Sequence, residues 1–413
     1  MSREKEAAFS IPVREFTYEL PASRIAAYPL GQRDMSKLLV YKQGGIRDAV
    51  FRELHHYLDP GAVMVFNDTK VIQARLEFFK ESGARIEIFC LNPELPSHDI
   101  QVSLASTTAS RWFCLVGNAK KWKSGELSVR IPEKSITLYA SLFSKKSEGY
   151  LVDFRWDPGN MSFADVLEAA GKTPLPPYIS RRPEESDRNT YQTVFARDEG
   201  SVAAPTAGLH FTPEVLKDLD KKGVLRRQLT LHVGAGTFKP VTGRTIGEHT
   251  MHAEEFHVNK RLLSDLATAE GPVVAVGTTS MRTLESLYWL GVRVYGGNIP
   301  EVGRRQYVSQ WEPYGREGRL PSAKSSLAAL LEWMNNEGIE QFTGETSLII
   351  VPGYEFKLTD VLLTNFHQPG STLLLLVAAF LGEGWKQAYG YALENGYRFL
   401  SYGDACLFFR NSK

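Results

Sequence analysis

The spacing of hydrophobic positions changes twice along the chain, and the first pattern covers its N-terminal part. KLLVY, at residues 37–41, is a short apolar run that predicts a strand. FRELHHYLDPG, at residues 51–61, predicts a short helix that is ended by Asp-Pro-Gly. Residues 62–78, AVMVFNDTKVIQARLEF, then predict a strand, a turn and a second strand.

Short runs rich in β-branched and aromatic residues characterise the second pattern, from residue 76 to 155. Turn residues separate these runs at the spacing of roughly 8–12 residues that is typical of barrels and sandwiches. The runs are RIEIFCL, DIQVSLAS, RWFCLVG, ELSVRIP, ITLYASLF and GYLVDFRW. We expect residues 76–155 to form a small antiparallel β-barrel domain inserted into a larger one.

The third pattern alternates helical and strand-like segments. PEVLKDLDKKG is a helix with Thr212 as its N-cap and Gly223 at its end. SLIIVPG (347–353) and VLLTNFHQ predict buried strands, and STLLLLVAAFLG predicts a buried helix. We expect residues 1–75 and 156–413 to form a major α/β domain with a mostly parallel sheet, which the polar excursion 291–345 interrupts.

Composition narrows the class of protein. The chain has 413 residues, a formal net charge of +1 and three cysteines without a CxxC pair, so neither a global positive field nor a disulfide framework is indicated. We interpret the cysteines as small buried residues of a protein in a reducing compartment. The N-terminus lacks an apolar signal segment, and the longest apolar run is too short to span a membrane. We expect a cytoplasmic protein that does not contact membranes.

Four predicted strands end in residues suited to a ligand site. LTLHV runs into GAGTF, VVAVG into TTSMRT, LIIVPG into YEF and LLTNF into HQPGST. The carboxyl ends of strands in an α/β sheet face one crevice, so we expect a shared site. Gly234 and Gly236 would allow a ligand to approach the backbone, although neither a P-loop nor a dinucleotide fingerprint is present. Thr278, Thr279 and Ser280 start a helix and suit a carboxylate or phosphate, unless they only cap it.

Histidines supply the candidate acids and bases. His210, His232 and His367 each follow a predicted strand or precede a helix, among small residues. A lone histidine is usually structural, but three at strand ends favour one general acid or base. The histidines of GEHTMHAEEFHV (His249, His252 and His257) have no HExxH order. Because strand alternation would scatter possible ligands there, we expect no metal.

Basic residues supply the candidate RNA contacts. NAKKWKSGE interleaves Lys120, Lys121 and Lys123 with Trp122, as in surfaces that hold a nucleic-acid backbone beside an exposed aromatic ring. A solvated hairpin is the alternative. Arg181 and Arg182, with Arg304 and Arg305, could extend the basic surface.

Longer segments resemble one family. They are FTYELPASRIAAYPLGQRDMSKLLV, VMVFNDTKVIQARL, PLPPYISR, YQTVFARDEGSVAAPTAGLHFT, LHVGAGTFKPV, MHAEEF, AVGTTSMRTLESL, LIIVPGYEF, LLTNFHQPGSTLLLLVAAFLG and YRFLSYGDACL. Together they are similar to the S-adenosylmethionine:tRNA ribosyltransferase-isomerases of queuosine synthesis. The resemblance covers most of residues 16–75, 172–290 and 346–408. The barrel region matches weakly, and the excursion is longer than the usual family linker.

The resemblance implies a reaction. Members of the family transfer and isomerise the ribosyl part of S-adenosylmethionine onto a 7-aminomethyl-7-deazaguanine base at the wobble position of tRNAs with GUN anticodons. Epoxyqueuosine-tRNA forms, and adenine and methionine leave. The resemblance also implies an α/β major domain with an inserted barrel. S-adenosylmethionine is a consumed substrate, so no cofactor is expected, and we expect a monomer.

Placing that chemistry on this sequence assigns roles. We expect His210 to be the leading general acid or base, with His232, His367 and Asp404 as weaker candidates. Thr278, Thr279 and Ser280 would hold the methionine carboxylate. The remaining substrate-binding candidates are Asn67, Asp68, Arg75, Thr206, Gly208, Gly234, Gly236 and Arg282.

Two other functions stay open on sequence grounds. An RNA methyltransferase that uses S-adenosylmethionine would release S-adenosylhomocysteine, whereas ribosyl transfer releases adenine and methionine. A non-catalytic tRNA-binding protein would bind without turnover.

Overall fold

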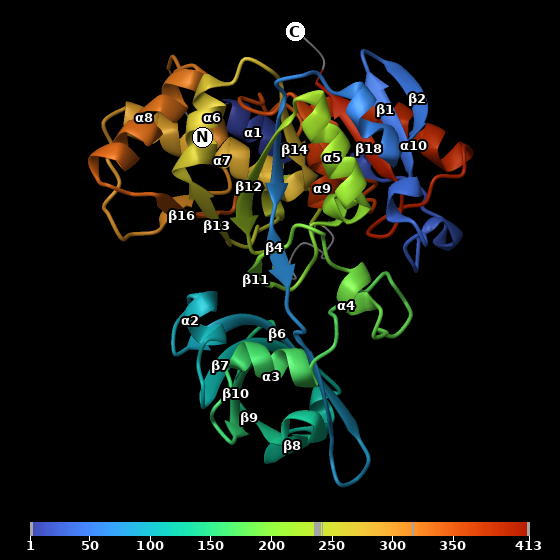
Figure 1. The fold of residues 1–413 in the computed structure, drawn as a ribbon, viewed down its shortest axis with the longest axis vertical. Coiled ribbons are helices and arrows are strands. Elements are labelled where there is room, and N and C mark those ends of the chain that lie inside the picture. Colours follow the sequence, from blue (N-terminus) through green and yellow to red (C-terminus); the bar gives the residue numbers. More distant parts are fainter. Residues whose placement is uncertain (1–2, 235–240, 242, 316–317, 411–413) are drawn as a thin grey trace.

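The computed structural model describes residues 3–234, 241, 243–315 and 318–410. Figure 1 shows a large α/β part above a smaller β part, with β4 (Thr69–Val71), β11 (Asp198–Ser201) and α4 (Asp187–Thr190) between them. β4 and β11 pair in parallel and form a two-stranded sheet at this junction. The predicted fold class, an α/β protein with an antiparallel barrel-like insertion, is confirmed.

A ten-stranded sheet forms the centre of the large part. The strands follow the order β15 (Gln306–Val308), β16 (Gln341–Thr346), β13 (Glu254–Asn259), β12 (Leu225–Leu231), β3 (Val63–Asn67), β14 (Val273–Val276), β17 (Val361–Asn365), β18 (Ala405–Phe409), β1 (Lys37–Lys42) and β2 (Gly45–Val50). The central strands β12, β3, β14 and β17 are parallel to one another. Antiparallel pairings occur toward both edges.

Helices cover both faces of this sheet because its strands are apolar on both sides. Val63 and Val65 of β3 face one core, which the helices α6 to α10 complete, and Met64 and Phe66 face a second core under α5. This is the side-chain alternation expected of a strand buried on both faces. The helices are α1 (Arg3–Ser10), α5 (Pro213–Lys222), α6 (Lys260–Thr268), α7 (Gly277–Tyr295), α8 (Ala323–Asn336), α9 (Thr372–Leu381) and α10 (Gly384–Glu394).

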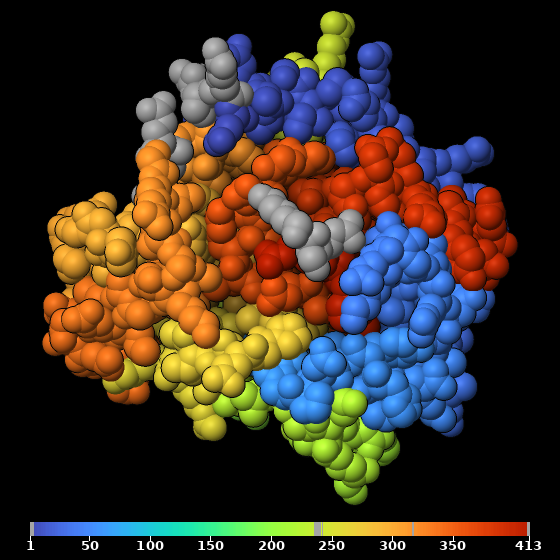
Figure 2. Space-filling view, turned by 90° about the horizontal axis from the view of Figure 1, so that it is seen from above, coloured from blue at the N-terminus to red at the C-terminus, as the bar shows by residue number. Residues whose placement is uncertain are grey.

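The two ends of the chain meet in the large part. Figure 2 shows segments from the N-terminal part, in blue, beside segments from the C-terminal part, in red. β1 pairs in parallel with β18, from Leu38 opposite Ala405 to Tyr41 opposite Phe408. The insertion therefore leaves and re-enters one folded unit.

The small part is a six-stranded antiparallel sheet that nearly closes on itself. It runs in the order β5 (Arg75–Phe79), β6 (Arg85–Leu95), β7 (Ala109–Gly117), β10 (Tyr150–Asp157), β9 (Ile136–Lys145) and β8 (Glu126–Ile131). The end strands β5 and β8 come into contact. α3 (Phe163–Ala170) packs Phe163 against Trp112, Phe154 and Trp156 of this sheet. The helix ends at Gly171.

Two local predictions are wrong, for DIQVSLAS and for SLIIVPG, whereas the short helix predicted from residue 51 is confirmed. DIQVSLAS contains a helix, α2 (Ile100–Leu104), because the Asp99 carboxylate accepts hydrogen bonds from the N–H groups of Gln101 and Val102. Residues 51–57 form a 3₁₀ helix (η4, Phe51–Tyr57). SLIIVPG is buried but forms no strand, since the sheet resumes earlier, in β16.

Other elements follow the prediction closely. The α5 helix begins after Thr212, whose side chain accepts a hydrogen bond from Val215 N–H, and it ends at Gly223 with φ +82°. The buried helix predicted from STLLLLVAAFLG is α9, with Ser371 as its N-cap. Among the described residues, no helix combines the length and the apolar character that a membrane crossing requires.

Candidate active site at the carboxyl edge of the sheet

A pocket opens where β14 and β17 end. It encloses about 670 Å³ of space, part of it open to solvent. Its floor contains small residues, Ala203 to Ala207, which precede and begin the 3₁₀ helix η7 (Thr206–His210). The polar lining residues are Tyr178, Thr206, Thr278, Thr279, Thr364, Asn365, His367, Gln368, Ser371 and Ser401. No Asp, Glu, Lys or Arg lines the pocket among the described residues.

Two helices point their N-termini at this pocket. α7 starts at Gly277 directly after β14, and Gly277, Thr278 and Thr279 line the pocket. Ser371, the N-cap of α9, lines it from another side. The first N–H groups of a helix have no intrahelical partner and carry partial positive charge, so they favour an anion. Ser280 does not face the ligand space, because its hydroxyl donates to Val276 O at 2.8 Å.

The loop that follows β17 contributes a histidine, His367, to the pocket lining. His367 is 8% exposed and its Nε2 lies 2.9 Å from the Thr364 hydroxyl. Burial lowers the pKa of His367 to about 3. The ring is therefore neutral at physiological pH.

His210 lies behind the pocket wall. Its Nδ1 contacts the Ser36 hydroxyl at 2.8 Å, its Nε2 contacts the Asn365 amide at 3.0 Å, and its ring packs on Phe51. Burial, followed by the nearby charge of Arg398, lowers the pKa of His210 to about 3. His210 is not one of the described lining residues. It reaches the pocket through Asn365, and its predicted catalytic role stays a prediction.

The residues at the end of β3 hold the sheet together, and the pocket lining does not include them. Asn67 donates to Leu231 O and accepts from Leu231 N–H and Thr69 N–H, which ties β3 to β12. Asp68 accepts from the Thr230 hydroxyl at 2.7 Å. Burial, opposed by that hydrogen bond and assisted by Asp198, raises the pKa of Asp68 to about 6.

Several other predicted site residues also have structural partners. Arg75 pairs with Glu87, and Asp404 accepts from Lys37 N–H and Arg398 N–H. Arg282 pairs with Glu254.

The three glycines that were predicted to contact substrate differ in where they lie relative to the pocket. Gly208 packs its Cα side against Thr193 and Phe195, where a Cβ would lie 2.8 Å from each. Gly234 follows the lining residue Val233, and its N–H contacts Glu254 at 3.4 Å. Gly236 lies outside the described residues.

Some of the predicted RNA-contacting residues are exposed, and others are buried or ion-paired. Lys120, Lys121 and Lys123 are exposed on the small sheet. The prediction of an exposed aromatic ring beside them is wrong. Trp122 is 1% exposed, because it packs in the core of the small part and its indole N–H donates to Gly125 O. Arg181 pairs with the buried carboxylate of Asp187, whereas Arg182 is exposed.

Sequence reasoning missed part of the lining. Tyr178 and Ser401 share a hydrogen bond of 2.7 Å at the pocket wall, and burial raises the pKa of Tyr178 to about 12. Asn365 and Gln368 flank His367 within the strand end that the sequence did single out. Nothing in residue spacing brings Tyr178 and Ser401 together, although both fall in segments that carry the family resemblance.

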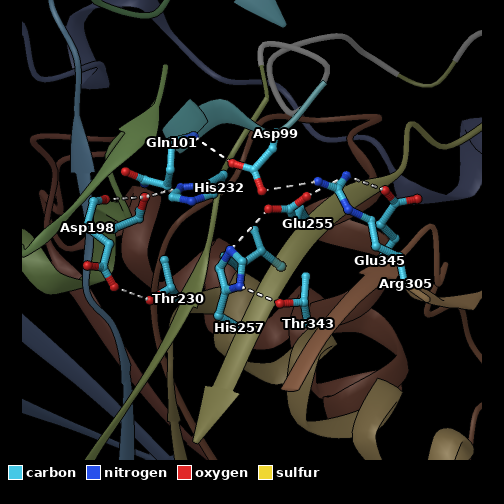
Figure 3. Close-up of polar contacts among 12 residues, drawn as sticks. Asp99, Gln101, Asp198, Thr230, His232, Glu255, His257, Arg305, Thr343 and Glu345 are labelled. Atoms are coloured by element: carbon cyan, nitrogen blue, oxygen red, sulfur yellow. Dashed lines mark hydrogen bonds and ion pairs between the residues drawn. The ribbon is translucent and has the colours of Figure 1, made fainter. Parts of the chain in front are cut away.

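A second polar cluster lies beside the pocket, where β12 and β13 meet the junction (Figure 3). His232, Glu255 and His257 place ligand-type atoms within 4.8 Å of one another. The expectation that strand alternation scatters such atoms fails for Glu255 and His257, which are two residues apart and share one face of β13. Burial and the neighbouring His257 lower the pKa of His232 to about 4.

Fold and pocket define the class of protein: an α/β protein with a pocket at the carboxyl edge of its sheet, the position where such folds commonly hold a ligand. The sequence profile of a family described as queuosine biosynthesis protein matches residues 13–408. The chain therefore belongs to that family.

Named relatives agree with this assignment. The chain is 38% identical over 399 residues to a Pelobacter propionicus S-adenosylmethionine:tRNA ribosyltransferase-isomerase, which covers 95% of this chain and 98% of that one. A protein of the same name from Gluconacetobacter diazotrophicus is 39% identical, with 96% of each chain covered. A crystal structure of the Thermotoga maritima S-adenosylmethionine tRNA ribosyltransferase is 31% identical and covers 96% of this chain and 100% of its own, with a TM-score of 0.45.

Proposed function

We propose that the chain is an S-adenosylmethionine:tRNA ribosyltransferase-isomerase and that the pocket binds S-adenosylmethionine. Family membership and the names of the relatives support the reaction. The observation that carries the site is the pair of helix N-termini, of α7 and α9, facing a pocket whose described lining has no charged side chain. Unpaired N–H groups can hold a carboxylate there without a lysine or arginine.

The ligand fits the pocket by its chemistry. The methionine carboxylate goes to the first turn of α7, at Thr278 and Thr279. The nucleoside goes to the floor of small residues from Ala203 to Ala207, which allows close approach to the backbone. S-adenosylmethionine is consumed in the reaction, and we expect no separate cofactor for this chemistry.

His367 is our candidate for proton transfer. The sulfonium acidifies the adjacent 5′ hydrogens and makes methionine a leaving group, so the reaction needs a base and then a proton donor. His367 lines the pocket as a neutral imidazole, with Nδ1 left for the substrate when Thr364 holds Nε2. His210 acts through Asn365 as a positioning residue in this proposal.

The acceptor is tRNA. We propose that the aminomethyl group of the 7-deazaguanine base in a GUN anticodon receives the ribosyl carbons, giving epoxyqueuosine-tRNA, adenine and methionine. The exposed Lys120, Lys121 and Lys123, with Arg182, are the candidate contacts to the tRNA backbone. We further propose a cytoplasmic monomer.

The test incubates purified protein with tRNA that carries the precursor base and with S-adenosylmethionine labelled in the ribose. We expect label in the tRNA, with one adenine and one methionine released for each ribosyl group transferred. S-adenosylhomocysteine in place of adenine would refute the proposal, as would binding of both substrates without turnover.

A further inference from the structure

His232 presents a buried ring nitrogen without a hydrogen-bond partner. The side chain is 8% exposed, and its Nε2 contacts no donor or acceptor among the described residues. Its Nδ1 lies 3.0 Å from the Thr69 hydroxyl, which donates to Asp198 O. Since a hydroxyl has one proton to donate, Nδ1 carries the ring proton and Nε2 keeps a free lone pair. Because buried polar atoms in folded proteins almost always have a partner, an unpaired buried nitrogen indicates a position where a ligand can bind.

Backbone geometry leaves room for this ring. Gly200 in β11 has a φ of +148°, and a Cβ there would lie 2.8 Å from both Cε1 and Nδ1 of His232. Glycine at that position therefore permits the close packing of β11 on the imidazole.

Two further ligand-type side chains lie close to this imidazole. His257 Nε2 and Glu255 Oε1 are 3.1 Å apart, and one ligand atom from each of His232, Glu255 and His257 lies within 4.8 Å of the other two. Ligands about 2.0–2.1 Å from a tetrahedral zinc ion are separated by about 3.3 Å. The Thr343 hydroxyl, 3.0 Å from His257 Nδ1, fixes the second ring as Thr69 fixes the first.

The surrounding charge favours a cation. Among the described residues, the one guanidinium of Arg305 faces three carboxylates, with distances of 2.6 Å to Glu255, 3.0 Å to Glu345 and 3.7 Å to Asp99 (Figure 3). One guanidinium cannot neutralise three carboxylates. The Glu255 and His257 side chains are 13% and 18% exposed, so an ion can reach them from solvent.

We propose that His232 Nε2, His257 Nε2 and Glu255 Oε1 bind a divalent transition-metal ion, of which zinc suits this donor set best. Two imidazoles and one carboxylate are a known zinc ligand set, with a fourth position left for water. The ion would join β12 to β13 next to Val233, which lines the pocket. It stands outside the pocket and takes no part in the proposed ribosyl transfer, so its test is independent of that proposal.

The test uses the full chain, stripped with EDTA and dialysed. Zn²⁺ is titrated against a chromophoric chelator, and Co²⁺ is added separately to record the visible spectrum of tetrahedral coordination. We expect one equivalent of Zn²⁺ per chain and a tetrahedral Co²⁺ spectrum that Zn²⁺ abolishes. If neither ion binds stoichiometrically, the proposal is overturned, and the contact between His257 and Glu255 is only a polar contact between two side chains.

Variants locate the ion. Glu255→Gln keeps the side-chain shape and, like His257→Ala, should weaken Zn²⁺ binding by more than about a hundredfold, whereas Thr343→Val should weaken it by about tenfold. His252→Ala, an exposed histidine of the same segment, is the matched control and should bind normally. Melting temperatures in EDTA verify that each variant is folded. Loss of binding in His252→Ala, or retention in both ligand variants, would refute the assignment.

Discussion

The pocket and the neighbouring cluster at β12 and β13 handle charge in opposite ways. In the described lining the pocket holds no charged side chain and relies on the helix N-termini of α7 and α9. The cluster instead gathers Arg305, Glu255, Glu345 and Asp99 within ion-pair distance. Helix N-termini can attract an anionic group without any charged side chain, while the side-chain charges of the cluster join segments at the junction to one another. The contrast predicts that pocket changes alter catalysis and that junction changes alter stability.

The largest effect is expected at His367. His367→Ala removes the imidazole that lines the pocket, and a positioned acid or base contributes about 10²–10⁴-fold to the rate. We expect kcat for adenine release to fall by that factor, with little change in the KM for S-adenosylmethionine. Initial rates at saturating tRNA measure it, with His252→Ala as control. A kcat within threefold (roughly) of wild type would remove His367 from catalysis.

Asp68 offers a test through pH. Its pKa is about 6 in the folded protein, above the value of about 3.9 in unfolded chains. The folded state therefore binds the proton more tightly, and the free energy of unfolding falls as pH rises from about 4 to about 6. Asp68→Asn cannot ionise, so relative to wild type it should gain about 2 kcal/mol between pH 4 and pH 7.

Urea unfolding at both pH values measures this gain. Glu337→Gln, at an exposed position, is the matched control and should follow wild type. Parallel pH curves for wild type and Asp68→Asn would show that Asp68 ionises normally.

The sequence predicted the fold and much of the pocket for the same reason. Strand ends converge at one edge of an α/β sheet, so TTSMRT and NFHQ located Thr278, Thr279 and His367 without any coordinates. Ile100, Val102 and Leu104 alternate as in a strand, and only the capping geometry of Asp99 reveals the helix there.

Long-range pairing was the part that could not be predicted. Tyr178 and Ser401 are 223 residues apart and meet only through the packed fold. His232 likewise meets β13 only because β12 and β13 pair. The burial of individual side chains could not be predicted either. His210 and Trp122 are residue types suited to catalysis and to base stacking, but neighbouring residues bury both.

A smaller effect is expected on the tRNA side. Replacing Lys120, Lys121 and Lys123 together by alanine removes three exposed charges from the small sheet. We expect tRNA affinity to fall about tenfold and its dependence on salt to weaken, with binding of S-adenosylmethionine unchanged. Filter binding over a range of salt concentrations measures both. A charge-matched triple variant at Lys217, Lys221 and Lys222 of α5 controls for net charge, and equal losses in the two would show that contacts are not specific to the small sheet.

The smallest effect is expected at Arg305, and its direction separates the two regions most clearly. Its side chain is 35% exposed, so solvent screens its ion pairs, and Arg305→Ala should lower the free energy of unfolding by only about 1 kcal/mol. The loss should shrink in high salt, because screening weakens the same pairs in wild type. Since Arg305 does not reach the pocket, kcat should stay within about twofold of wild type. Arg305→Lys keeps the charge and should recover part of the stability. A tenfold (roughly) fall in kcat with unchanged stability would mean that the junction charges act on the pocket, and the division between the two regions would be lost.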